Sequence, residues 1–174
     1  MKEENRLIQI ENQVLISEIT RMFNVMGKKS VTIVARGYSM RPFIEDRRDK
    51  VILTPPRTPM IGDVVLAKIG ESRYALHRVI KEENGIYTMQ GDGNPTYMTE
   101  TFRMEDIIAV ADSFIRKGKR IETTSRTWRA YSFMWRILKP FRRIILGIYR
   151  RVKKNKRTVK HENQKRTPVT ERMR

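Results

Sequence analysis

Three residues of the types that build a nucleophile, base and acid set occur in order within the first hundred positions. They are Ser39, His77 and Asp92. A serine hydroxyl becomes a nucleophile when a neighbouring base accepts its proton, and a carboxylate can hold the imidazole in the orientation that this requires. The other histidine of the chain, His161, lies in a charge-rich tail. If His77 is not a catalytic base, no base chemistry by an imidazole is expected in this protein.

Each of these residues, taken alone, also has a purely structural interpretation. His77 lies in a predicted strand between apolar neighbours, where a histidine often serves only packing and a hydrogen bond. Asp92 lies in a Gly-Asp-Gly-Asn run, which is typical of a loop. Ser39 follows a predicted strand and a glycine and precedes an arginine–proline step, a turn that can present its hydroxyl at the edge of a sheet but is a weak signal by itself. Both interpretations stay open for each residue by itself.

The short sequence motifs around these residues, and the order of these motifs along the chain, resemble those of the signal peptidase I and LexA-type serine peptidase superfamily. The four matching boxes are Ser39-Met40-Arg41-Pro42, Gly62-Asp63-Val64-Val65, Leu76-His77-Arg78-Val79 and Gly91-Asp92-Gly93-Asn94. In that family the first box holds the nucleophile, the second lies on a core strand and the third holds the general base. The base is lysine in the usual bacterial signal peptidases and histidine in the endoplasmic-reticulum and archaeal type, which this chain resembles. The resemblance covers residues 30–116.

The resemblance implies a serine endopeptidase that works through an acyl-enzyme. Ser39 would attack the scissile carbonyl with its backbone N–H stabilising the oxyanion, His77 would accept and return the proton, and Asp92 would orient the imidazole. The substrate, a precursor, leader or signal-like peptide, would bind as an extended strand. No cofactor is implied. Supporting roles are expected for Gly37, Met40 and Pro42 in the nucleophile loop and for Asp63 and Asn94 outside it.

The chain departs from the family pattern at three points. Lysine-type enzymes often carry a serine two places before the nucleophile as an oxyanion donor, and this place is Gly37 here. Many members carry a second acid after the last box, whereas here the nearest acid is Glu100. Membrane signal peptidases have a transmembrane anchor, and no such segment is visible in the sequence.

The hydrophobic pattern predicts the elements that position these residues. Residues 5–26 repeat apolar side chains at three- and four-residue steps, which indicates an amphipathic helix ending near Gly27. From residue 30 the period becomes two, which predicts a series of short strands. Such strands at close spacing favour a mainly β fold, a coiled sheet or barrel of the signal peptidase/LexA type, over a βαβ fold. The predicted strands are 30–36, 50–54, 63–68, 74–81, 85–90 and 107–116.

A strongly cationic segment follows the predicted strands. Residues 1–115 hold 16 basic and 16 acidic side chains, whereas 116–174 hold 21 basic and 3 acidic ones and so carry the whole net charge of +18. Residues 126–152 are rich in large apolar side chains that arginines and Pro140 interrupt, which predicts amphipathic helices and not a membrane span. The expected organisation is an N-terminal helix at 1–29, a β-rich peptidase domain at 30–116, a basic amphipathic helical segment at 117–152 and a disordered basic tail at 153–174.

This segment predicts an anionic partner. Hydrophobic insertion and attraction to anionic lipid reinforce each other, so residues 126–157 are expected to bind a membrane surface. The expected location is therefore cytoplasmic and peripheral on the inner face of the cell membrane. Nucleic acid ranks lower because phosphate contacts do not require large aliphatic side chains. Three alternatives stay open: an amphipathic helix docked on the β body, a merely solvated basic run, and an inactive membrane- or nucleic-acid-binding module on the same fold.

Composition excludes several other classes of protein. The chain has no cysteine, which excludes disulfide bonds and thiolate metal sites. A single histidine in the β body cannot build the common zinc ligand sets, so no metal site is expected. The first residues carry acids and amides where a secretory signal needs an apolar run, and no such signal is expected. A length of 174 residues fits one domain with appendages.

Overall fold

The structure is a computed structural model that describes residues 2–138, 141, 144–149 and 151–152. The chain divides into two compact units, 1–139 and 140–174. All of the strands belong to the first unit. The tail predicted at 153–174 and the interruption predicted at Pro140 lie outside the described residues.

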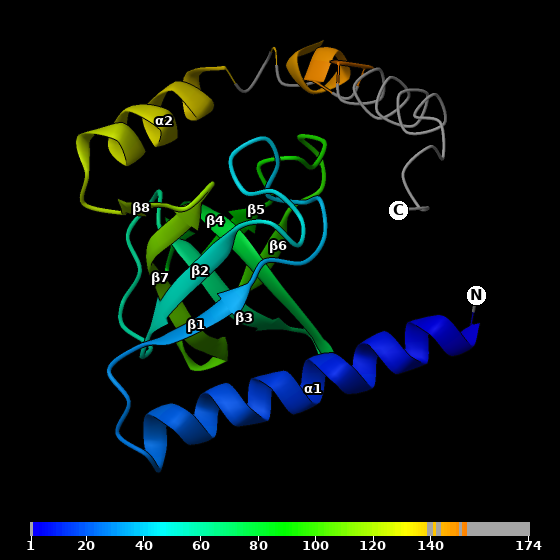
Figure 1. Cartoon of the computed structure of the whole chain (residues 1–174), viewed down its shortest axis with the longest axis vertical. Coiled ribbons are helices and arrows are strands. Elements are labelled where there is room, and N and C mark those ends of the chain that lie inside the picture. The colour runs from blue at the N-terminus through cyan, green and yellow to red at the C-terminus, as the bar shows by residue number, and fades with distance from the viewer. Residues whose placement is uncertain (1, 139–140, 142–143, 150, 153–174) are drawn as a thin grey trace, which may run out of the picture. The chain divides into compact units, whose positions relative to one another are not determined.

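An antiparallel sheet of eight strands forms the centre of the first unit and curls into a half-barrel (Figure 1). The order is β1-β2-β7-β3-β4-β5-β6, and β8 pairs with β7. The prediction of a mainly β fold is therefore confirmed. The strands are β1 (Val31–Val34), β2 (Lys50–Thr54), β3 (Val64–Ile69), β4 (Arg73–Glu83), β5 (Ile86–Gln90), β6 (Glu100–Phe102), β7 (Ile107–Arg116) and β8 (Lys119–Glu122), with a short 3-10 helix, η1 (Met104–Asp106), before β7.

Two of these strands, β6 and β8, were not expected from the sequence. β6 has three residues, too few to show an alternating pattern, and β8 reads Lys-Arg-Ile-Glu with no apolar run. The turn before β8 contains Lys117 and Gly118, both at positive φ (50° and 78°), as a tight hairpin requires. The segment expected to be helical from residue 117 therefore begins with a strand, and its helix, α2 (Arg126–Ile137), starts later.

Both faces of the central strand β3 are buried. Val64 and Leu66 belong to one apolar cluster, and Val65 and Ala67 belong to a second. Alternate residues of a strand point to opposite faces, so the curled sheet encloses β3 between two cores. Such enclosure gives the strand pairs β3–β4 and β3–β7 a rigid setting for the loops that they carry.

The two helices of this unit pack on the larger cluster. In α1 (Lys2–Asn24), Ile16, Ile19 and Phe23 recur at three- and four-residue steps and are buried in this cluster. In α2, Trp128 stacks on Phe114 of β7, with ring centroids 4.5 Å apart. Figure 1 shows α1 along one side of the sheet and α2 at the opposite side.

None of the described helices combines the length and the apolar character that a membrane span requires.

Candidate active site

The predicted nucleophile lies in a long loop, residues 35–49, between β1 and β2. Ser39 is half-buried in this loop. Gly37 has φ 90°, a conformation that side chains disfavour, and its N–H donates to Asp46 Oδ1 at 2.8 Å. Met40 is 5% exposed in the apolar cluster, and the carbonyl of Pro42 accepts a hydrogen bond from Arg116 of β7. The loop is therefore pinned on both sides of Ser39.

A buried carboxylate holds the far end of the same loop. Asp49 is 1% exposed and accepts hydrogen bonds from the Arg48 guanidinium at 2.7 Å and from the Glu45 N–H at 2.8 Å. Burial acts to raise the pKa of Asp49, but these hydrogen bonds outweigh it and hold the pKa below its usual value. Arg41 in turn forms an ion pair with Glu45. The loop is thus tied together by charges as well as by its apolar anchor.

The predicted base, His77, lies on β4 and is buried. Its Nδ1 is 2.6 Å from Oε2 of Glu100, the first residue of β6. The register explains how these residues meet: Val79 pairs with Met89 on β5, and Met89 pairs with Glu100. Val79, Met89 and Glu100 thus lie side by side across β4, β5 and β6. Val79 is two residues after His77 on β4, so both side chains point to the same face of the sheet.

The electrostatics of this pair favour an ionised carboxylate. The hydrogen bond from His77 is the main cause that lowers the pKa of Glu100; partial burial opposes it, and the charges of His77 and Arg73 add to it. Arg73 lies 3.3 Å from the other carboxylate oxygen. An ionised carboxylate accepts hydrogen bonds only, so Nδ1 of His77 is the donor in this contact. The second ring nitrogen, Nε2, is then left with a lone pair that can take up a proton.

The loop Gly91–Asn94 brings His77 and Ser39 together. The N–H of Gly93 donates to the Ser39 carbonyl at 2.6 Å. A Cβ added to Gly91 would stand 2.5 Å from that same carbonyl and 3.0 Å from His77 Nε2. Only glycine permits so close an approach, and it places the base nitrogen beside the nucleophile loop. Figure 1 shows this loop and the loop of residues 35–49 side by side.

Ser39 itself has two groups free for a substrate. Within residues 2–138, no acceptor takes a hydrogen bond from its hydroxyl or from its backbone N–H. A serine hydroxyl and a backbone N–H without internal partners are the groups that acyl transfer with oxyanion stabilisation uses.

Asp92 makes no hydrogen bond with His77. Its carboxylate, which is fully buried, accepts two hydrogen bonds from Arg78, Nε to Oδ1 at 2.9 Å and Nη2 to Oδ2 at 2.7 Å. The hydroxyl of Tyr131 on α2 donates to Oδ2 at 3.1 Å. His77 and Arg78 are consecutive on a strand and so point to opposite faces, and Asp92 lies on the face of Arg78. The orienting contact expected from Asp92 is therefore made by Glu100.

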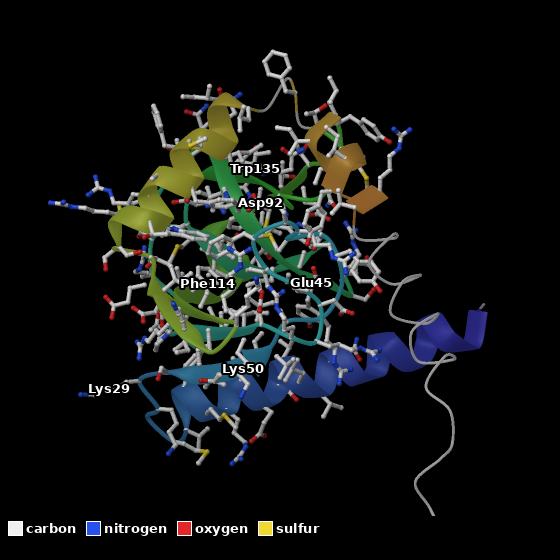
Figure 2. All side chains as sticks on the ribbon, turned by 45° about the horizontal axis from the view of Figure 1, so that its top comes forward. Lys29, Glu45, Lys50, Asp92, Phe114 and Trp135 are labelled. Carbon is white, nitrogen blue, oxygen red and sulfur yellow. The ribbon has the colours of Figure 1, made fainter. Side chains whose placement is uncertain are left out.

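The pKa values of the groups around Asp92 are both raised. Burial works against the charge of Arg78, but the charge and hydrogen bonds of Asp92 outweigh it and raise the pKa of the guanidinium. Burial raises the pKa of Tyr131, and the negative charge of Asp92 adds to this. Arg78 is thus held as a cation and Tyr131 as a neutral donor. Figure 2 shows Asp92 beneath α2, with Trp135 nearby.

The remaining supporting residues have structural contacts. Asp63 accepts hydrogen bonds from Arg57 at 2.8 Å and from the Met60 N–H at 3.0 Å, which shapes the loop before β3. The side-chain amide nitrogen of Asn94 lies 2.9 Å from the position of a Gly91 Cβ, next to His77 Nε2. Asn94 is therefore near the predicted base, whereas the contacts of Asp63 hold the loop before β3.

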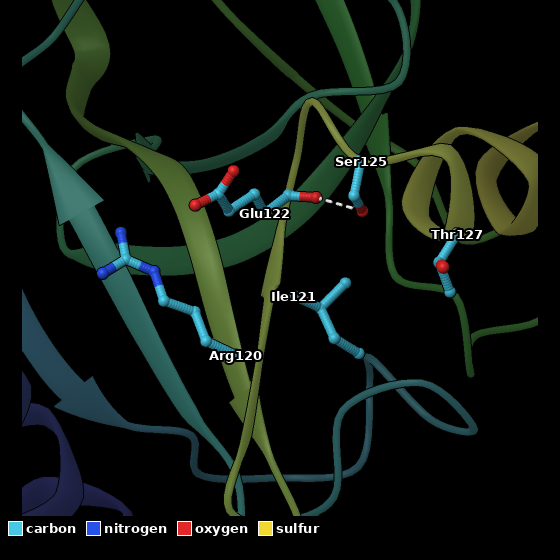
Figure 3. A pocket seen from close by; sticks show the side chains of 5 residues that line it. All are labelled: Arg120, Ile121, Glu122, Ser125 and Thr127. Atoms are coloured by element: carbon cyan, nitrogen blue, oxygen red, sulfur yellow. Dashed lines mark hydrogen bonds between the residues drawn. The ribbon is translucent and has the colours of Figure 1, made fainter.

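A shallow depression between β8 and the start of α2 is lined by Arg120, Ile121, Glu122, Ser125 and Thr127 and by none of the predicted site residues (Figure 3). Among the described residues, no three His, Cys, Asp or Glu side chains cluster as a metal site would require.

Comparison of the chain with protein-family models, with curated proteins and with solved structures finds no match.

The two acids are expected to respond differently to removal. Asp92→Ala leaves the buried Arg78 guanidinium without its counter-charge, and such a change costs about 3–5 kcal/mol of unfolding free energy. Urea denaturation followed by circular dichroism measures this cost. The matched control is Glu83→Ala, which removes an exposed acid from an ion pair with Lys81 and should change stability little. An Asp92→Ala protein as stable as the control would contradict the buried pair.

The Glu100–His77 contact predicts an acid-dependent loss of stability. The folded pKa of Glu100 lies below its ordinary value of 4.5, so its contribution to stability is complete above that value and is lost as pH falls through the folded pKa. The stability advantage of the wild type over Glu100→Gln should therefore shrink on acidification from about pH 6 to about pH 3. Urea midpoints across this range test it, with exposed Glu105→Gln as control. A difference that stays constant with pH would count against the contact.

Proposed function

We propose that the protein is a serine endopeptidase with Ser39 as nucleophile, His77 as general base and Glu100 as the acid that orients the imidazole. The observation that carries this proposal is the 2.6 Å contact between His77 Nδ1 and Glu100, with the other ring nitrogen, Nε2, next to Gly91, which packs against the Ser39 carbonyl. Arrangements of this kind recur on unrelated folds and are identified by geometry and roles.

The reaction would proceed in two halves. His77 Nε2 takes the proton of the Ser39 hydroxyl as its oxygen attacks the scissile carbonyl, and the Ser39 N–H stabilises the oxyanion. The imidazolium, held by Glu100, then gives that proton to the leaving amine as the peptide bond breaks. Water, deprotonated by His77, attacks the acyl-enzyme and releases the second product with Ser39 regenerated.

A peptide substrate fits the position of β1. This strand ends the path of the sheet, pairs with β2, and leads directly into the nucleophile loop. An extended chain can add to the outer edge of such a strand through main-chain hydrogen bonds, which brings its carbonyl groups toward the loop. The substrate would then be a precursor, leader or signal-like peptide in extended conformation.

The proposal is tested by labelling with a fluorophosphonate, a probe that reacts with serines activated by a base. Wild-type protein should be labelled, and Ser39→Ala and His77→Ala should lose labelling. Glu100→Ala should lower the rate by about 10²- to 10⁴-fold, because the imidazole loses its orientation. The control is Ser17→Ala, which removes an exposed serine of α1 and should leave the rate unchanged. Labelling that persists in Ser39→Ala would reject the assignment.

We propose in addition that residues 126–157 bind an anionic lipid surface and hold the protein on the inner face of the cell membrane. On α2 the large side chains of Phe133, Met134 and Ile137 are 56–59% exposed. Arg126 and Arg129 are exposed on the same helix. In the second unit, taken by itself, Phe141, Ile144, Ile148 and Val152 are also exposed. Apolar side chains that insert beside arginines that meet lipid phosphates are the pattern of an interfacial helix.

Flotation with vesicles tests the lipid proposal. The protein should float with phosphatidylglycerol–phosphatidylcholine vesicles and not with pure phosphatidylcholine, and added salt should weaken binding. The triple variant Phe133→Ser, Met134→Ser, Ile137→Ser should bind at least about ten-fold more weakly. A control that removes exposed apolar side chains elsewhere, Val14→Ser with Met60→Ser, should bind as the wild type does. Equal binding by the triple variant would contradict the proposal.

A further inference from the structure

One face of α2 carries polar groups into the body of the protein. Trp128, Tyr131, Ser132 and Trp135 recur at three- and four-residue steps and therefore share a face. Trp128 is 3% exposed, and Tyr131 and Ser132 are half-buried. Core-facing positions of a helix are normally apolar, so two hydroxyl groups here require partners.

The first hydroxyl contact reaches the strand of the base. Arg78 Nη1 donates to Ser132 Oγ at 2.7 Å and to the Gly62 carbonyl at 3.0 Å. The guanidinium also lies over the Trp128 ring, 4.5 Å from its centroid. Arg78 directly follows His77 on β4, so a shift of its side chain is transmitted to the backbone that carries the imidazole.

The second hydroxyl contact reaches the loop that holds the nucleophile. Tyr131 donates to Asp92 Oδ2 at 3.1 Å. Asp92 lies between Gly91 and Gly93, and both glycines pack closely against the Ser39 loop. The Gly93 N–H also donates a hydrogen bond to the Ser39 carbonyl. Movement of the Asp92 side chain therefore moves the peptide unit that sets the position of Ser39.

The two contacts belong to one buried network that is nearly complete. A guanidinium has five N–H groups, and those of Arg78 reach two oxygens of Asp92, the Gly62 carbonyl and Ser132. A buried polar network with its hydrogen bonds satisfied holds a single geometry, and one that loses partners holds it less firmly. Loss of the helix hydroxyls would loosen this geometry while leaving the Arg78–Asp92 pair intact.

We infer that Tyr131 and Ser132 of α2 are positioning residues for the peptidase reaction. They act through Asp92 on Ser39 and through Arg78 on His77, so both reacting groups depend on one turn of the same helix. Neither residue touches the substrate. The inference rests on the proposed peptidase function, and it assigns to α2 a role in the site besides its exposed apolar face.

The test measures the rate of Ser39 phosphonylation by the fluorophosphonate at saturating concentration, separately from the concentration that gives half the maximal rate. The double variant Tyr131→Phe, Ser132→Ala keeps the ring stack on Trp135 and removes both hydroxyls. We expect the saturating rate to fall about ten-fold, since small displacements of reacting groups cost large factors, while the half-saturating concentration stays unchanged. A purely structural role would lower the urea midpoint and leave the rate of the folded protein as it was.

Two further variants make the test specific. Thr127→Ala removes a hydroxyl from an exposed position of α2 and should react at the wild-type rate. Ser132→Ala should slow the reaction on its own, and Ser132→Thr, which keeps a hydroxyl, should restore most of the rate. Should the double variant not fold, this pair of single variants decides the question. Wild-type labelling with variant rates within about two-fold of it would overturn the inference alone. Absence of labelling in the wild type would overturn the proposed function as well.

Discussion

The ion pair between Arg78 and Asp92 is the interaction on which the arrangement of the site depends. Both side chains are almost completely buried, and removing two charges from water costs far more than one ordinary contact returns. The cost is offset because the carboxylate accepts two parallel hydrogen bonds and because Ser132 and a main-chain carbonyl accept from Arg78 while Tyr131 donates to Asp92. Strand β4, the loop after β5 and helix α2 are therefore joined at one point.

The pair also explains why the two acids near His77 have different partners. His77 and Arg78 are neighbours on a strand and point to opposite faces, so each selects the carboxylate on its own side. Asp92 is buried beside a permanent cation and has no hydrogen bond to the imidazole. Glu100, on the other face, is partly exposed and hydrogen-bonded to the ring. Only the second carboxylate is placed to stabilise a charge that appears on the imidazole during a reaction.

The sequence predicts those features that depend on local pattern and misses those that depend on register. Alternating apolar residues locate six strands, but β6 and β8 are too short or too polar to show a period. The order of the motifs predicts that Ser39, His77 and the Gly91–Asn94 loop lie close together. In the structure Gly91 lies against both the Ser39 carbonyl and His77 Nε2. The pairing of Glu100 with His77 passes through β5 and leaves no trace in spacing. The spacing of the motifs also does not reveal that Asp92 forms an ion pair with Arg78, because a sequence motif does not show which face of a strand its side chains contact.

Helix α2 unites two properties that composition had assigned to separate parts of the chain. Its cationic and apolar residues predict a membrane-binding segment, with an amphipathic helix docked on the β body as the alternative. Yet Trp128 lies in the main apolar cluster, and the hydroxyl of Tyr131 reaches the buried carboxylate of Asp92. One face of α2 therefore lies in the core. The opposite face is exposed, and Phe133 and Met134 on it are more than half accessible. Because the inner face of α2 contacts Asp92 and Arg78, this helix connects an exposed apolar surface to the buried ion pair.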